Sequence, residues 1–140
     1  MREIHKTIHL TLDGKPQTFR LCKLDAFSGA QLLQTMKRYL PEIEADPKRS
    51  QKLADLIDPI FLALSPMELQ RLMTSCLSHT EVLLDAGYQL VMQMGEWSWP
   101  ELEHDPATCL KLTLESVLWS LDSFFTGVGS KSRPAADSRA

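Results

Sequence analysis

Two cysteines and two histidines in the second half of this chain form a candidate set of ligands for a metal ion. Cys76 and His79 are separated by two residues, and His104 and Cys109 follow further along the chain. A structural zinc site needs four such ligands that converge tetrahedrally, usually from two close pairs. Cys109 adjoins Leu110 on an apolar helix face, where small buried cysteines are common. We therefore predict that these residues bind no metal and that the chain uses no cofactor.

His104 lies close in sequence to Glu101 and Glu103, and a histidine beside carboxylates could act as a general base. Acidic residues before a helix also complement its dipole and remain solvated. The chain has no nucleophile-elbow sequence and no glycine-rich phosphate loop. These observations predict an interaction protein rather than an enzyme. A small hydrolase that uses His104 with one of the two glutamates is the alternative.

Trp97 and Trp99 are candidates for contact with a protein partner. They lie in the segment 95–105, whose glycine, proline and acidic residues argue against regular structure. Tryptophans on a loop either cover the core or anchor a partner, because tryptophan is enriched at interface hot spots. Met92 and Met94 add flexible apolar side chains of the kind that adaptable binding surfaces use. We predict partner binding by these four residues, with core cover as the alternative for the tryptophans.

The elements that must position these residues begin with a β-hairpin over about residues 3–24. Apolar and polar residues alternate in both of its arms, which is the period of a half-buried strand. Asp13 and Gly14 stand between the arms and favour a two-residue turn in which both residues have positive φ. Residues 80–94 are either a second hairpin that joins this sheet or an irregular helical stretch, and the pattern favours extended structure.

Apolar spacing predicts two helical segments after the hairpin. Asp25 can cap the first, over about 27–40, and Pro41 ends it. A second apolar stripe with helical spacing runs over residues 53–64. Pro59 lies inside that stripe and predicts a kink or a break.

Clear start signals mark two later helices. Ser65 can cap one of them, Pro66 suits its first position and Glu68 completes a capping box. The last helix is predicted over about 106–126, with Gly127 after its end. Its predicted apolar stripe consists of Leu110, Leu114, Val117, Leu118, Leu121, Phe124 and Phe125.

Strands followed by helices predict an α+β fold, with an N-terminal hairpin packed on several helices and a long C-terminal helix. Of 140 residues, 44% are hydrophobic and 24% are charged, which is typical of a globular chain. We predict a single domain over residues 1–128. Residues 129–140 contain no large apolar side chain and are predicted to be a disordered tail.

Charge and hydropathy exclude several classes of function. The net charge of −3 argues against a nucleic-acid-binding protein, which is usually basic. No apolar run approaches the roughly 20 residues of a membrane span, so no membrane partner is expected. Three scattered cysteines are typical of a reducing compartment, so we expect a cytoplasmic protein. A basic N-terminal part and an acidic middle part could favour homo-oligomers or an oppositely charged partner.

Three stretches of the chain together carry a family resemblance. They are LTLDGKPQTFRLCKLDAFSGAQLL, IFLALSPMELQRLM and GEWSWPELEHDPATCLKLTLE. In this order they resemble the tail assembly chaperones of long-tailed bacteriophages and prophages. The resemblance covers about residues 5–125 and rests on patterns of folding. It carries no functional residue across, because this family has no fixed motif of functional residues.

The resemblance implies a small non-enzymatic protein that is made in the host cytoplasm and is absent from the mature virion. Such a protein is expected to coat the tape measure protein, to keep its apolar helices soluble and to help recruit tail tube protein. A longer form made by ribosomal frameshift would continue from the segment 129–140 into a second domain. Helix-in-groove contacts can cover the apolar stripes of such a client. A small protein-interaction or regulatory module of prophage or bacterial origin would share these features and is the alternative.

Overall fold

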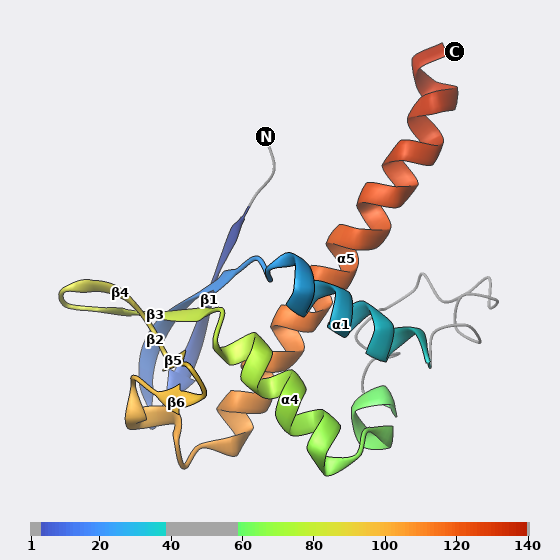
Figure 1. The fold of residues 1–140 in the computed structure, drawn as a ribbon. Helices are drawn as coiled ribbons and strands as arrows, with labels where there is room; N and C mark the ends of the chain where they lie inside the picture. The colour runs from blue at the N-terminus through green and yellow to red at the C-terminus, as the bar shows by residue number, and fades with distance from the viewer. Residues whose placement is uncertain (1–3, 39–58, 140) are drawn as a thin grey trace.

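The computed structural model describes the backbone of residues 4–38 and 59–139, and the side chains as far as residue 122. The fold is α+β, as predicted, with two antiparallel sheets beside a group of helices (Figure 1). The larger sheet has the strand order β1 (His5–Leu12), β2 (Lys15–Cys22), β3 (Thr80–Leu84) and β4 (Gly87–Leu90). The smaller sheet has β5 (Met92–Gln93) and β6 (Glu96–Trp97), and the helices are α1 (Ala26–Lys37), α4 (Pro66–Leu77), the 3₁₀ helix η1 (Pro100–Leu102) and α5 (Pro106–Arg139).

Two hairpins build the larger sheet. β1 and β2 pair along their full length around Asp13 and Gly14, whose φ angles of 50° and 77° belong to the predicted turn. β3 and β4 form the second hairpin over the range where extended structure is predicted. β2 and β3 are antiparallel neighbours. The second hairpin therefore extends the sheet from the β2 side and leaves β1 at one edge.

The two faces of this sheet differ in polarity. Ile8, Phe19 and Val82 stand opposite one another across three strands and belong to the apolar core. On the other face, Arg20 stands opposite Glu81, and both side chains are partly exposed. The alternation that predicts the hairpin therefore also separates a face that packs against helices from a polar outer face.

The N-terminal end of α1 is capped by Asp25, as predicted. Its carboxylate accepts hydrogen bonds from the backbone N–H groups of Phe27 and Ser28, at 3.1 and 3.2 Å. These bonds satisfy amide groups that have no partner inside the helix. A hydrogen bond from the Ser28 side chain, together with these backbone bonds, holds the pKa of Asp25 below its usual value. The helix ends at Lys37, slightly earlier than predicted.

α4 begins with the predicted capping box. The backbone N–H of Glu68 donates to the Ser65 hydroxyl, and the backbone N–H of Ser65 donates to the Glu68 carboxylate, each over 3.1 Å. Residues 59–63 are also helical. The predicted end of α1 at Pro41 and the residues 53–58 of the preceding apolar stripe lie outside the described residues.

α5 contributes to two apolar clusters. The helical cluster joins α1, α4 and α5 through buried residues that include Leu32, Leu72 and Leu121. The sheet cluster lies beneath the larger sheet, where Phe19 and Leu112 are both fully buried. Because α5 runs through both clusters, it holds the sheet and the helical layer together.

The buried face of α5 agrees with most of the predicted stripe, because Val117 and Leu121 are buried and Leu114 and Leu118 pack against the helical cluster. As far as residue 122, the buried residues of the helix are Cys109, Leu112, Thr113, Ser116, Val117, Ser120 and Leu121. Phe124 and Phe125 of the predicted stripe lie outside the described side chains. Leu110 is 38% exposed, so its predicted place in the core is wrong. Small hydroxyl residues take part in this face, and the buried Thr113 hydroxyl donates to the Cys109 carbonyl at 2.8 Å. Counting only large apolar residues therefore includes Leu110 wrongly and leaves the small buried residues out of the face.

α5 also continues to Arg139, beyond the predicted end at residue 126 (Figure 1). Gly127 does not end it, because glycine costs a helix only about 1 kcal/mol and does not forbid helical backbone. Residues 129–139 are helical, whereas disorder is predicted for 129–140. These last turns extend away from the sheet and the other helices (Figure 1). The boundary of the predicted domain at residue 128 stays a prediction.

Candidate functional site

The two methionines predicted to bind a partner lie in different environments. Met92 is only 6% exposed and belongs to the sheet cluster, whereas Met94 is 99% exposed. Met94 and Gly95 form the turn between β5 and β6, with φ angles of 52° and 79°. The left-handed region is unfavourable for a methionine. Of the two, only Met94 presents an apolar side chain to solvent in this conformation.

Trp97 and Trp99 pack against the sheet cluster and are partly exposed. Trp99 meets the buried Phe19 ring edge-on, with ring centroids 6.0 Å apart and planes at 66°. The segment 95–105 is more regular than predicted, because β6 and η1 lie within it. Both tryptophans therefore cover the core, and a role in partner binding stays a prediction for their exposed edges.

A groove of about 340 Å³ lies between α1 and α4. Arg38, which follows α1, pairs with Glu68 near the start of α4. At the other end, Oδ1 of Asp25, which precedes α1, lies 3.2 Å from Nε2 of His79, which follows α4. The two helices therefore run antiparallel. The groove is lined by Leu24, Ser28, Gln31, Leu32, Gln34, Thr35, Arg38, Glu68, Arg71, Leu72 and Ser75.

The lining of this groove is mixed, with polar side chains in the majority beside three leucines, of which Leu32 and Leu72 are almost fully buried. Leu32 and Leu72 belong to the helical cluster, and Leu24 packs against it. Glu68 at one end accepts a hydrogen bond from the Ser65 backbone and another from Arg38, and both hold its pKa below the usual value. Such a groove can take up apolar side chains while its rim contacts polar groups.

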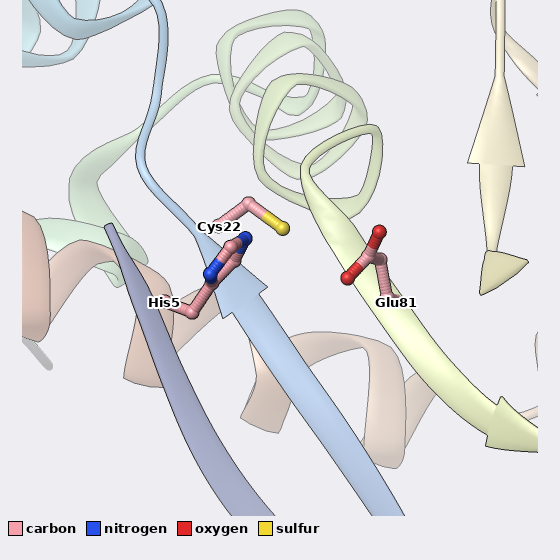
Figure 2. A group of neighbouring side chains, drawn as sticks. All are labelled: His5, Cys22 and Glu81. Atoms are coloured by element: carbon pink, nitrogen blue, oxygen red, sulfur yellow. The ribbon is translucent and has the colours of Figure 1, made fainter. Parts of the chain in front are cut away.

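A second candidate site lies on the outer face of the larger sheet, where His5, Cys22 and Glu81 converge (Figure 2). One potential ligand atom of each residue lies within 4.8 Å of the other two. His5 stands directly opposite Cys22 across β1 and β2, and Glu81 comes from β3. In Figure 2 the Cys22 sulfur lies between the imidazole ring and the carboxylate.

The environment of this cluster is polar but partly desolvated. Burial raises the pKa of the Cys22 thiol to about 11, with a further contribution from the Glu81 carboxylate and an opposing one from Arg20. Arg20 contacts Oε1 of Glu81 through both Nε and Nη2, each at 2.6 Å. The Arg20 guanidinium also lies 3.8 Å from the centre of the Tyr88 ring. These contacts fix the carboxylate beside the thiol.

The four residues considered as metal ligands from the sequence do not meet. Cys76 belongs to the helical cluster and Cys109 to the sheet cluster, where its thiol donates to the Leu102 carbonyl at 3.3 Å. Burial raises the pKa of Cys76 to about 12. His79 lies against the α1 cap, and His104 is exposed.

The hydrolase alternative finds no assembled site in the described part of the chain. Glu101, Glu103 and His104 are all exposed. None of the hydrogen bonds and ion pairs of the described residues joins the histidine to either glutamate. The groove between α1 and α4 lies elsewhere and is lined by none of the three.

Sequence reasoning missed both the groove and the outer-face cluster. The groove lies between two helices that are separated by a long stretch of chain, so no local sequence pattern predicts it. Part of the cluster could be predicted from the sequence, because a two-residue turn at Asp13 and Gly14 places His5 opposite Cys22. The addition of Glu81 depends on the pairing of β2 with β3, for which the sequence offers no register signal.

Comparisons of this chain with protein-family models, curated proteins and solved structures find no match. Across residues 4–38 and 59–139, no helix combines the length and the apolar character needed to cross a membrane. The interpretation of function therefore starts from the groove, the exposed apolar residues and the sequence resemblance.

Proposed function

We propose that this chain is a tail assembly chaperone of a long-tailed bacteriophage or prophage. In this proposal it binds the tape measure protein in the host cytoplasm and keeps that protein soluble during tail morphogenesis. A longer frameshifted form recruits tail tube protein, and neither form enters the mature virion. The resemblance of residues 5–125 to this family supports the proposal, and the groove between α1 and α4 supplies a place for the client.

The groove is the observation that carries the proposal. A client helix presents apolar side chains at intervals of three and four residues, and these can enter a groove between two helices. Leu24, Leu32 and Leu72 supply the apolar contacts, and the groove volume of about 340 Å³ fits a few side chains. Gln31 and Arg71 on the rim can bond polar groups of the client. An amphipathic helix presents apolar and polar groups together, as this mixed lining does.

Exposed apolar residues also lie outside the groove lining. Phe27 is 82% exposed near the start of α1, and Met67 is 63% exposed near the start of α4. Met94 stands at the tip of the β5–β6 hairpin. A contiguous apolar patch marks a binding surface, whereas single exposed residues such as these are normal on soluble proteins. They offer a client further contacts outside the groove.

The proposal requires a client gene and a groove-dependent effect. A very long, largely helical open reading frame should lie immediately downstream of this gene. A helical fragment of its product should stay soluble when it is produced together with this chain. If the neighbouring genes encode no such protein, the proposal fails.

A matched pair of variants tests the groove itself. Gln31→Trp places a large side chain in the groove, whereas Gln70→Trp makes the same change at an exposed position of α4 that does not line it. The Gln31→Trp protein should lose most of its ability to keep the fragment soluble, and the Gln70→Trp protein should keep it. Circular dichroism establishes that both variants fold. Equal activity of the two folded variants would contradict the role of the groove.

A further inference from the structure

We propose that His5, Cys22 and Glu81 bind a single divalent transition-metal ion such as Zn²⁺ on the outer face of the sheet (Figure 2). This inference goes beyond the chaperone proposal and does not depend on it. It concerns the outer face of the sheet, and no residue is shared between this cluster and the groove.

The ligand chemistry favours a transition metal. Imidazole nitrogen, thiolate sulfur and carboxylate oxygen are the three protein ligand types that zinc uses. Hard cations such as Mg²⁺ and Ca²⁺ prefer oxygen ligands alone, whereas a thiolate with an imidazole selects Zn²⁺ or Co²⁺. Three protein ligands leave a fourth tetrahedral position for water or another ligand. The set therefore resembles an open site more than a closed structural one.

The distances suit a tetrahedral ion after small side-chain rotations. All three ligand atoms lie within 4.8 Å of one another. Zinc bonds of about 2.0–2.3 Å place neighbouring ligands of a tetrahedron roughly 3.5 Å apart. The His5 side chain is exposed and the Glu81 side chain is partly exposed on the outer face of the sheet, so both can rotate to bring their ligand atoms closer without disturbing the core.

The backbone around the cluster is well ordered by hydrogen bonds. The N–H of Cys22 donates to the His79 carbonyl over 2.8 Å, and the N–H of Lys23 donates to the Ile4 carbonyl over 2.9 Å. These two bonds tie β2 to the start of β3 and to the start of β1. They set the separation of the strands that carry the three ligands.

Arg20 acts as a positioning residue for the carboxylate. Both of its contacts are made to Oε1 of Glu81, so Oε2 is the oxygen left for the cation. Groups that hydrogen-bond a metal ligand orient it and tune its affinity. The cation would in turn stabilise a thiolate next to a carboxylate, an arrangement that is unfavourable without a positive charge.

The accessible thiol distinguishes this site from the rest of the chain. The chain has three cysteines, and Cys76 and Cys109 are buried whereas Cys22 is partly exposed. His9 is the second exposed histidine on the outer face of β1, but it lies 3.1 Å from Thr18 instead of the cluster. It therefore serves as a matched control for His5.

Titration of the full chain, without a histidine tag, with Zn²⁺ or Co²⁺ tests the site. We expect one cation per chain, and for Co²⁺ the charge-transfer absorption of a thiolate ligand. His5→Gln, Cys22→Ser and Glu81→Gln should each weaken binding by more than about ten-fold, since loss of even an indirect partner costs that much. His9→Gln should bind as the unchanged protein does.

Alkylation of the unchanged protein gives a readout that does not depend on the folding of any variant. Cys22 should react before Cys76 and Cys109, and Zn²⁺ should slow its reaction. The proposal is overturned if Zn²⁺ leaves the reactivity of Cys22 unchanged, or if no Co²⁺–thiolate absorption develops. Equal losses in His5→Gln and His9→Gln would also overturn it, because the ligand assignment would then be wrong.

Discussion

Replacing Met94 with asparagine should stabilise this protein. Met94 has a φ angle of 52° and its side chain is 99% exposed, so it occupies an unfavourable backbone conformation without compensating burial. The left-handed region costs an ordinary residue about 1–2 kcal/mol. Asparagine adopts it more readily, and Asn-Gly is among the best sequences for this two-residue turn. Met94→Asn should therefore raise the free energy of unfolding by about 1 kcal/mol.

Urea unfolding followed by circular dichroism measures this change, and the melting temperature should rise by about 3–4 °C. Met67→Asn is the matched control, because Met67 is also exposed but lies in α4. Asparagine is a poorer helix former than methionine, so the control should lose roughly 0.5 kcal/mol. An unchanged or reduced stability of Met94→Asn would refute the argument from backbone strain. If Met94 contacts the client, the stabilised variant should also hold the client less well.

Four further predictions follow from contacts in the core, the capping box and the outer-face cluster. Trp99→Ala should lower the free energy of unfolding by about 2–4 kcal/mol, because it removes core cover and an aromatic contact; a variant of unchanged stability that fails to hold the client would instead support an anchor role. Ser65→Ala should cost about 1 kcal/mol in urea unfolding through loss of the helix cap. Folding lowers the pKa of Glu68. Its contribution to the free energy of unfolding should therefore be fully present above the pKa that Glu68 has in the unfolded chain, and it should disappear as the pH falls through the lower pKa of the folded state. Urea unfolding of the unchanged protein and of Glu68→Gln across this pH range measures the difference. Burial, with a further contribution from Glu81, raises the pKa of Cys22 to about 11, so Zn²⁺ must displace a proton from the thiol. The apparent affinity for Zn²⁺ should therefore rise about ten-fold per pH unit between pH 7 and 9, and a flat profile by calorimetry would contradict thiolate ligation.

Elements with strong local signals could be predicted from the sequence. Alternating side chains and the Asp13-Gly14 turn predict the first hairpin and its register, and the structure has both. Asp25 and Ser65 mark helix starts through side-chain oxygens that bond free backbone N–H groups. These features depend on neighbouring residues alone, so tertiary packing does not change them.

Features that depend on tertiary packing could not be predicted in the same way. A methionine gives no signal for positive φ, so the β5–β6 hairpin around Met94 was not expected. The buried face of α5 includes Thr113, Ser116 and Ser120, which a count of large apolar residues assigns to the surface. The groove and the outer-face cluster depend on how α1, α4 and β3 are placed by the rest of the fold.

Site-specific photo-crosslinking tests the central claim, which is that a client helix lies in the groove between α1 and α4. A photoreactive amino acid is placed at Gln31 in the groove or at Gln70 outside it, and the chain is irradiated with a helical fragment of the downstream protein. We predict abundant crosslinks from position 31 to apolar positions spaced three or four residues apart in the fragment, and few from position 70. Equal crosslinking from the two positions, or none from position 31 while the fragment stays soluble, would contradict the account.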